Sequence, residues 1–258
     1  MFQIKPLSLL FLSASLAIGL AGSFNQAVGQ TVRFQTNVGD IEVQLHPNDA
    51  PIAVANFWSY VNAPAGSNYD GTFFHRSVTN FIVQGGGFYL PVDGIANEVP
   101  SLPPIVNEFG ISNTRGTLAF AKIGGDPDSA TNQWFFNTED NSDNLDVQNG
   151  GFTVFGTVVT GLNIVDAIQA APLFNFGGPF TSVPLINNDA DFVTVNSITV
   201  VPVLLGDVDL DGSVTFADIP AFIAVLQSGG FQNEADADQN AAVDFGDISA
   251  FIAILIGQ

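Results

Sequence analysis

The sequence contains no cysteine among its 258 residues. Disulfide bonds, zinc sites built from thiolates and enzymes with a thiol nucleophile are therefore excluded. Basic residues are also scarce, with 5 Lys and Arg against 25 Asp and Glu and a net charge of -20. Because binding to nucleic acid and to anionic membranes depends on basic residues, we expect neither as a partner.

Phenylalanine, glycine and proline are abundant. The chain has 24 Phe, 26 Gly and 14 Pro, and hydrophobic residues make up 47% of it. This apolar fraction can form a substantial core, while the many glycines and prolines favour turns and short strands over long helices. A length of 258 residues suits one large domain or two small ones.

Residues 1–29 have the pattern of a secretory signal peptide. Lys5 gives a positively charged start, residues 7–20 form an apolar run, and small residues offer cleavage after Ala21 or Gly29. The run is too short for a typical membrane span, and a retained anchor is the alternative. We expect an exported protein in the periplasm, at the cell surface or outside the cell, with no membrane segment once the signal is removed.

The patterning after the signal favours a mainly β fold. Alternating apolar and polar residues predict a hairpin of strands at 31–36 and 40–46. Helical spacing after Pro51 predicts a helix with Asp49 as its cap. Further strands are expected at 116–121, 133–137, 152–159 and 191–201, a second helix at 162–170, and loops at 91–104 and 172–184. Many short strands with two helices fit a closed antiparallel barrel.

Residues 73–88 hold one of the few arginines of the chain, set among aromatic side chains. A strand, a bend and a second strand would direct Arg76, Phe81 and Gln84 at one shallow groove. An arginine beside a phenylalanine suits a ligand with both an apolar ring and a polar amide. The alternative is that the phenylalanines belong to a β core and that Arg76 is a solvated charge at a sheet edge.

The order of motifs carries a family resemblance. The run Phe-His-Arg, four residues, Phe-x-x-Gln-Gly-Gly at 74–86 is followed by related segments at 113–121, 126–137, 144–146, 154–159 and 161–168. Together they resemble the cyclophilins, the peptidyl-prolyl cis-trans isomerases, over about residues 31–201. The resemblance implies a closed eight-stranded antiparallel barrel with two helices in a domain at residues 30–202. It also implies no cofactor for catalysis, and proline-containing peptides or unfolded proteins as substrates.

The resemblance further assigns roles to single residues. It implies that Arg76, Phe81 and Gln84 are catalytic, with Arg76 donating to the prolyl nitrogen and Gln84 bonding the substrate backbone. The positions that it implies for substrate binding are Ile82, Ala121, Gln133, Phe135, Leu145 and Phe152. A protein that holds proline-containing segments without turnover is the alternative, although a plain proline pocket would not require Arg76.

Residues 203–258 contain a repeated acidic loop. Residues 207–218 place oxygen-bearing side chains at positions 1, 3, 5, 9 and 12, with Gly212 at the sharp turn, which is close to an EF-hand calcium loop. A second copy begins 29 residues later, and each loop precedes a similar apolar helix, at 221–226 and 250–255. The alternative is an acidic, solvated turn. The expected ligands of structural Ca2+ are Asp207, Asp209, Asp211, Thr215 and Asp218, then Asp236, Asp238, Asn240, Asp244 and Asp247.

These tandem loops resemble type I dockerin modules. The resemblance implies a small all-α domain at residues 203–258 that folds when it binds calcium and then docks onto a cohesin-like partner. We therefore expect an exported isomerase with a calcium-dependent docking tail. An extracellular calcium-dependent scaffold, in which the tail is the main function, is the alternative.

Overall fold

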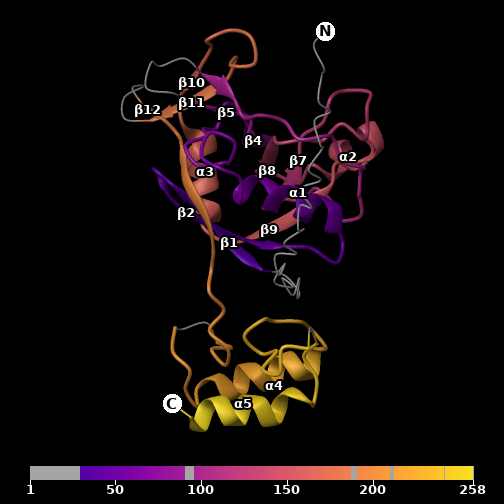
Figure 1. Ribbon diagram of the computed structural model, residues 1–258, viewed down its shortest axis with the longest axis vertical. Coiled ribbons are helices and arrows are strands. Elements are labelled where there is room, and N and C mark those ends of the chain that lie inside the picture. Colours follow the sequence, from indigo (N-terminus) through magenta and orange to yellow (C-terminus); the bar gives the residue numbers. More distant parts are fainter. Residues whose placement is uncertain (1–29, 91–95, 187–190, 210–211, 241, 258) are drawn as a thin grey trace, which may run out of the picture.

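The computed structural model describes residues 30–90, 96–186, 191–209, 212–240 and 242–257 (Figure 1). The expected signal peptide at 1–29 lies outside these residues. Within them, every helix falls short of the length and apolar character that a bilayer crossing requires.

An eight-stranded antiparallel sheet forms the body of the fold (Figure 1). Several pairs of neighbouring strands in this sheet are distant in sequence. The sheet curls around one apolar interior. The expected first hairpin is present as β1 and β2, in register from Thr31 opposite Gln44 to Thr36 opposite Gly39. In sheet order the strands are β13 (Val195–Val200), β1 (Thr31–Thr36), β2 (Gly39–Leu45), β9 (Val154–Thr160), β7 (Thr117–Phe120), β8 (Trp134–Asn137), β4 (Ile82–Gly85) and β3 (Arg76–Val78).

The barrel is less closed than predicted, because the end strands β13 and β3 do not pair with each other. The outer edge of β3 is taken instead by residue 182: Arg76 forms a parallel bridge with Ser182, and Ser77 N donates to Ser182 O at 2.8 Å. The segment that precedes β3 contacts β13 at the other end of the sheet, where Gly71 N donates to Val195 O at 2.7 Å. The molecule is a curled sheet whose ends are joined by a short irregular link.

The two expected helices, α1 (Pro51–Val61) and α3 (Leu162–Ala170), bury their apolar sides in the same core as the sheet. Trp134 lies fully buried in this core, with Phe34 and Phe136 packed edge-on to it at ring-centroid distances of 5.3 and 5.6 Å. Perpendicular aromatic packing of this kind stabilises a core beyond the area that it buries. The large number of phenylalanines is thus used mainly in the interior.

Helix α1 begins differently from the prediction. Ala50 occupies the N-cap position and makes no side-chain cap, so the assignment of Asp49 was wrong. The N–H groups of Ile52 and Ala53, which have no partner within the helix, donate instead to the carboxylate of Glu108, at 3.1 and 2.8 Å. A carboxylate at a helix N-terminus satisfies unpaired donors and matches the helix dipole. Because Glu108 is 55 residues away from Ala53, local sequence patterns could not reveal it.

Two segments that were predicted as loops contain short strands. The first holds β6 (Asn97–Glu98), which pairs with β5 (Phe88–Tyr89), and residues 91–95 lie outside the described part. The second holds β10 (Leu173–Phe174) and β11 (Val183–Ile186), which form a small sheet with β12 (Asp191–Phe192). Phe88, Phe174 and Phe192, from three of these strands, pack with Val183 and Leu185 of β11 into a separate apolar cluster beside Phe73. The expected strand at 191–201 is accordingly divided into β12 and β13. One further short helix, α2 (Ser142–Leu145), precedes a 3-10 turn at Gln148–Gly150.

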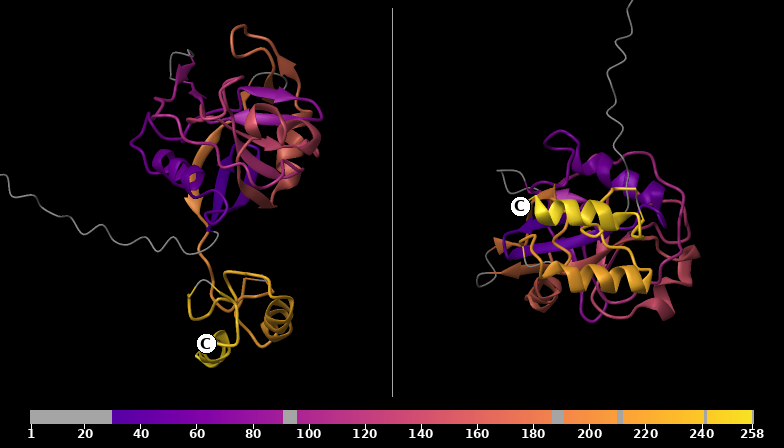
Figure 2. Two further views of the ribbon diagram at one scale, coloured as in Figure 1. Left: turned by 90° about the vertical axis from the view of Figure 1, so that its right-hand side faces the viewer. Right: turned by 90° about the horizontal axis from the view of Figure 1, so that it is seen from below.

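The C-terminal part of the chain contains two helices, α4 (Asp218–Ser228) and α5 (Asp247–Ile256), as the repeat predicted. They lie side by side, and the rings of Phe222 and Phe251 stack at 4.0 Å with 7° between their planes (Figure 2). These two residues occupy the same place in the two copies of the repeat. The apolar cluster around them consists only of residues 208–255 and is separate from the core of the sheet.

Candidate functional site

A row of side chains crosses five strands on the face of the sheet that is turned away from its core. Strand register places Arg76 opposite Gln84, Gln84 opposite Phe135, Phe135 opposite Ala119, and Ala119 opposite Val154. Side chains that face each other across paired strands point to the same side of a sheet. Distant segments of the sequence therefore meet along one line of the surface.

The neighbouring positions in these strands point the other way. Val83, Phe136 and Leu118 alternate with the members of the row and are fully buried in the main core. The same strands thus build the interior with one face and the candidate site with the other. Gly86 directly follows β4 with φ +82, and a Cβ added there would lie 2.5 Å from the indole nitrogen of Trp134. Glycine at this position allows the turn and the close packing against Trp134 together.

Hydrogen bonds join the polar members of the site. Arg76 Nη1 donates to Gln84 Oε1 at 3.1 Å, and Gln84 Nε2 donates to Gln133 Oε1 at 2.8 Å. Arg76 is half-buried, and in the described part of the chain it forms no ion pair with a carboxylate. Burial lowers the pKa of its guanidinium from the ordinary value, but an arginine keeps its proton at any working pH. A guanidinium has five N–H donors, so the bond to Gln84 leaves others for a ligand.

A cluster of apolar side chains, which we take as the pocket for an apolar group, adjoins this polar row. Phe81, Ala121 and Phe152 are partly exposed around a buried floor that includes Phe135 and Leu145. The ring of Phe152 lies edge-on to Phe135 with centroids 5.8 Å apart. The sequence-predicted residues that come together in this one apolar cluster are Phe81, Ile82, Ala121, Phe135, Leu145 and Phe152.

Several contributors to this pocket were not predicted. Ala119 and Val154 complete the buried floor, and Ile111 packs beside them. Asn141 donates from Nδ2 to the carbonyl of Phe81 at 2.8 Å and so holds the turn that carries the Phe81 ring. The alternation within the strands could have indicated Ala119 and Val154, whereas the contact of Asn141 depends on the tertiary fold.

His75, next to Arg76, is buried beneath the groove at 2% exposure. Burial, and to a smaller extent the charge of Arg76, lower the pKa of its imidazole to about 4, although hydrogen bonds with Gln133 and the backbone of Phe73 act in the opposite direction. Its ring lies edge-on to Phe88 at 4.9 Å. A neutral, enclosed imidazole agrees with a structural role under the groove.

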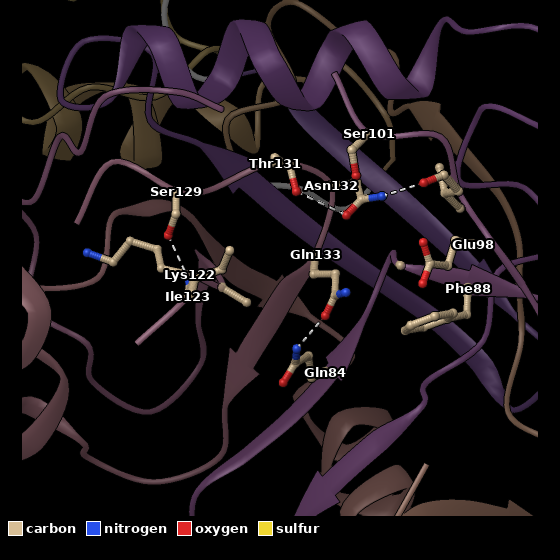
Figure 3. Close-up of a pocket in the computed structure, with 13 residues that line it drawn as sticks. Gln84, Phe88, Glu98, Ser101, Lys122, Ile123, Ser129, Thr131, Asn132 and Gln133 are labelled. Carbon is tan, nitrogen blue, oxygen red and sulfur yellow. Dashed lines mark hydrogen bonds between the residues drawn. The ribbon is translucent and has the colours of Figure 1, made fainter. Parts of the chain in front are cut away.

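A second, polar pocket opens beside the apolar one (Figure 3). Its volume is about 350 Å3, and Gln84, Ala121 and Gln133 line both it and the neighbouring site. Glu98 and Lys122 also line it. The sequence did not predict this pocket, because one part of its wall, Glu98, Val99 and Ser101, comes from the segment at 91–104 that was predicted as a loop.

The tail holds two groups of carboxylates. Ligand oxygens of Asp207, Asp209 and Asp218 lie within 4.8 Å of one another, and the equivalent residues of the second copy are grouped in the same way. Asp218 and its counterpart are fully buried at the helix starts. A set composed only of oxygen donors suits a hard cation such as Ca2+. The three residues of the second group are Asp236, Asp238 and Asp247.

The remaining predicted ligands lie differently. Thr215 Oγ1 accepts the N–H of Ala217, and Asp244 Oδ1 accepts that of Gly246, so both oxygens support turns. Asn240 donates from Nδ2 to Asp238. Asp211 lies outside the described residues. Gly212 has φ +87, as a sharp turn at this loop position requires.

The fold is thus that of a mainly β protein with a curled antiparallel sheet, and its candidate site places one arginine beside an apolar cluster. Comparison with known proteins gives the particular family. Residues 31–188 match the family described as cyclophilin type peptidyl-prolyl cis-trans isomerase/CLD. The chain belongs to this family and is a cyclophilin-type peptidyl-prolyl cis-trans isomerase.

Individual relatives agree with this assignment. A peptidyl-prolyl cis-trans isomerase of Acinetobacter baylyi is 42% identical over 162 residues, which is 62% of this chain and 82% of that protein. Peptidyl-prolyl cis-trans isomerase B of Escherichia coli is 40% identical over 144 residues, which is 54% of this chain and 83% of that protein. A crystal structure of a cyclophilin type isomerase from Cryptosporidium parvum shares the fold, with a TM-score of 0.51 at 22% identity over 67% of this chain and 98% of that one.

Proposed function

We propose that this chain is an exported isomerase in which Arg76 is the central catalytic group of residues 30–202. The observation that carries the proposal is a half-buried guanidinium beside an apolar pocket, without a carboxylate partner in the described part of the chain. A buried cation without a counter-ion weakens stability, so its presence requires another use. Donation to a substrate is the use that this geometry serves.

The chemistry needs no nucleophile and no cofactor. Resonance gives the X-Pro amide a rotation barrier of about 18–20 kcal/mol, and uncatalysed isomerisation takes tens to hundreds of seconds. Twisting the amide breaks this resonance and leaves a lone pair on the prolyl nitrogen. The proline ring occupies the pocket beside Phe81 and Phe135, and Arg76 donates to that nitrogen. Because the lone pair exists only in the twisted amide, this bond favours the transition state over both planar forms.

The glutamine pair positions the other half of the substrate. Gln84 holds Arg76 on one side and Gln133 on the other. By this arrangement the arginine is fixed before the substrate arrives, and little of its freedom is lost on binding. Gln84 then bonds the substrate backbone, with Ile82 and Leu145 in the floor and Phe152 at the rim of the pocket.

The test compares Arg76→Ala with the parent on a short X-Pro peptide, by a protease-free isomerisation assay. Removing one preorganised donor to a transition state typically costs on the order of 100-fold to 1000-fold in rate, and we expect kcat/KM to fall by about that much. The matched control is Arg33→Ala. Arg33 lies on β1, and its Nη2 is 2.7 Å from Oε1 of Glu42 on β2. A folded parent without turnover, or an Arg76→Ala variant as active as the control, would refute the proposal.

We further propose that residues 203–258 are a dockerin-like module that folds on binding Ca2+ and attaches the enzyme to a cohesin-like partner. The supporting observation is the duplication: two carboxylate groups, each at the start of a helix, are related by the 29-residue repeat whose helices stack through Phe222 and Phe251. Without a cation, each group brings like charges together at a free-energy cost. Export, to the periplasm, the cell surface or the outside, is proposed from residues 1–29 alone.

Calorimetric titration with Ca2+ tests the module. We expect two bound ions per chain and a gain of helicity on binding. The double variant Asp218→Asn with Asp247→Asn should bind neither ion and gain no helicity, because each of the two expected calcium sites loses one buried carboxylate. The control, Asp70→Asn with Asp166→Asn, removes two carboxylates outside the tail and should bind as the parent does. Absence of binding by the parent would leave the tail as a set of acidic turns.

A further inference from the structure

A series of buried asparagine side chains lies beside the apolar cluster of the site. Asn113 and Asn137 are fully buried, and Asn141 is 7% exposed. Asn141 Nδ2 donates to the carbonyl of Phe81 at 2.8 Å and to Asn137 Oδ1 at 2.7 Å. Asn137 Nδ2 donates to Asn113 Oδ1 at 3.2 Å, and Asn113 Nδ2 donates to the carbonyl of Phe152 at 2.9 Å. These bonds form one path between the backbone at Phe81 and the backbone at Phe152.

Every amide hydrogen of the three asparagines has an acceptor. The second hydrogen of Asn137 goes to Thr117 Oγ1 at 2.8 Å, and that of Asn113 goes to Asp146 Oδ1 at 3.0 Å. The carboxylate of Asp146 also accepts the hydroxyl of Ser112 and the backbone N–H of Asn113. A buried polar network with all its donors paired is rigid and specifies one arrangement of the groups that it joins.

The amide of Asn141 does not serve the helix that follows it. Asn141 occupies the N-cap position of α2, where an asparagine commonly accepts a backbone N–H of the first turn. It makes no such bond, and Asp140 Oδ1 accepts the N–H of Ser142 instead, at 3.1 Å. The start of α2 thus leaves this amide unexplained, whereas its bond to Phe81, 60 residues away in sequence, gives it a use.

Both aromatic residues at the ends of the path lie outside regular strands. Phe81 lies between β3 and β4 and follows Asn80, which has φ +54. Phe152 precedes β9 and follows Gly151, which has φ +76. Phe135, in contrast, lies within β8 and is held by the strand ladder. Connections are less constrained than strands, so the positions of the Phe81 and Phe152 rings depend on the bonds at their backbone.

We infer that the three asparagines are positioning residues of the isomerase, which fix the two rings relative to each other. The inference rests on the proposed function, since these rings border the pocket that holds the proline ring beside Arg76. Binding of an apolar ring is non-directional and tolerates a looser pocket, whereas donation to the prolyl nitrogen requires a fixed geometry. The network therefore supports kcat more than it supports binding.

The experiment measures kcat and KM separately for Asn141→Asp in the full chain, with a short X-Pro peptide. Aspartate keeps the size of the side chain and suits an N-cap, but its carboxylate has no hydrogen for Phe81 or Asn137. A misplacement of about 1 Å can cost on the order of 100-fold in rate, and only one residue of the network is lost here. We expect kcat to fall by about tenfold and KM to change by less than about twofold. Asn141→Ala, which adds no charge, should act in the same direction.

The matched controls are Asn56→Asp and Asn56→Ala. Asn56 lies on α1, is also 7% exposed, and donates from Nδ2 to the carbonyl of Thr131 at 2.7 Å. These variants lose a comparable bond outside the apolar cluster, so they should become less stable in urea while the folded protein keeps the parent kcat. All rates are expressed per folded protein, as measured by circular dichroism under the assay conditions.

A double variant tests whether the two ends of the path act together. Asn113→Ser removes the donor to the Phe152 carbonyl. If one connected network holds both rings, this change and Asn141→Asp each lower kcat, and the double variant is little slower than the slower single variant. If the two effects on kcat multiply, the contacts are independent and the network is refuted. If one single variant does not fold, the kcat of the other decides.

The remaining outcomes separate this inference from the proposed function. If Arg76→Ala is impaired but the Asn141 variants keep the kcat of the Asn56 controls, the asparagines are purely structural, and the positioning network is refuted while the isomerase stands. If KM rises and kcat is unchanged, the network serves binding and the inference is equally refuted. If the folded parent turns over no peptide, both the isomerase and the network are refuted.

Discussion

His75 is an example of a residue whose surroundings decide its chemistry. It lies buried beside Arg76 and between aromatic rings, and its pKa is lowered to about 4. A proton added to this imidazole would meet both a low-dielectric interior and a neighbouring guanidinium. At neutral pH His75 is therefore uncharged, and isomerisation, which transfers no proton, does not require it to be otherwise.

This lowered pKa predicts a loss of stability in mild acid. The unfolded chain takes up the proton near the ordinary pKa of 6.5, whereas the folded chain takes it up near 4. The stabilising contribution is thus complete above about pH 6.5 and is lost as the pH falls toward 4. The shift corresponds to a loss of up to about 3 kcal/mol. Urea unfolding of parent and His75→Gln between pH 7 and 4 should show a weaker pH dependence in the variant.

His46 supplies the comparison for that measurement. Burial also lowers the pKa of its imidazole, and its Nε2 lies 2.8 Å from Thr157 Oγ1, away from the groove. The His46→Gln variant retains His75 and should keep most of the acid-dependent loss. Equal slopes in His75→Gln and the parent would contradict the assignment.

At the scale of elements, strand alternation and the order of motifs predicted most strands of the main sheet. The first hairpin, the central strands and both helices near 51–61 and 162–170 lie where periodicity placed them. Local patterns failed where distant residues complete an element. The strand β6 exists because it pairs with β5, and the closure of the barrel is interrupted because Ser182 bonds the outer edge of β3.

The start of α1 gives a prediction at this scale. Glu108 accepts two backbone N–H groups of its first turn, across a large separation in sequence. Glu108→Ala should lower the free energy of unfolding by about 1–2 kcal/mol, the usual contribution of a helix cap. Glu139→Ala, also a glutamate on a connection between elements, should change it by less than about 0.5 kcal/mol. Thermal or urea unfolding measures both, and equal effects would show that Glu108 is not a cap.

At the scale of the whole molecule, the main core of the sheet and the apolar cluster between α4 and α5 share no residue. One lies within the sheet and its helices, and the other lies between α4 and α5 beyond the end of β13 (Figure 1). We therefore expect that removal of Ca2+ by a chelator unfolds the tail but leaves the isomerase activity nearly unchanged. A collapse of activity on chelation would show that the two parts are coupled.

The sequence was most informative about this division where it repeats itself. The 29-residue offset predicted both α4 and α5, and the stack of Phe222 on Phe251 shows why the copies belong together. Neither helix alone could cover its apolar side. The polar pocket at Glu98 was beyond sequence reasoning, because its walls are brought together only when β5 and β6 pair beside β8.

The row from Arg76 to Val154 also bears on how this protein can change over generations. Each member comes from a different strand, and each strand turns its alternate residues into the core. Inserting or deleting a single residue within any of these strands would exchange the two faces, and would remove a member of the site together with part of the interior. Heritable variation in length is thus confined to the connections between strands. The segments between these strands can therefore change in length over generations while the row itself is inherited unaltered.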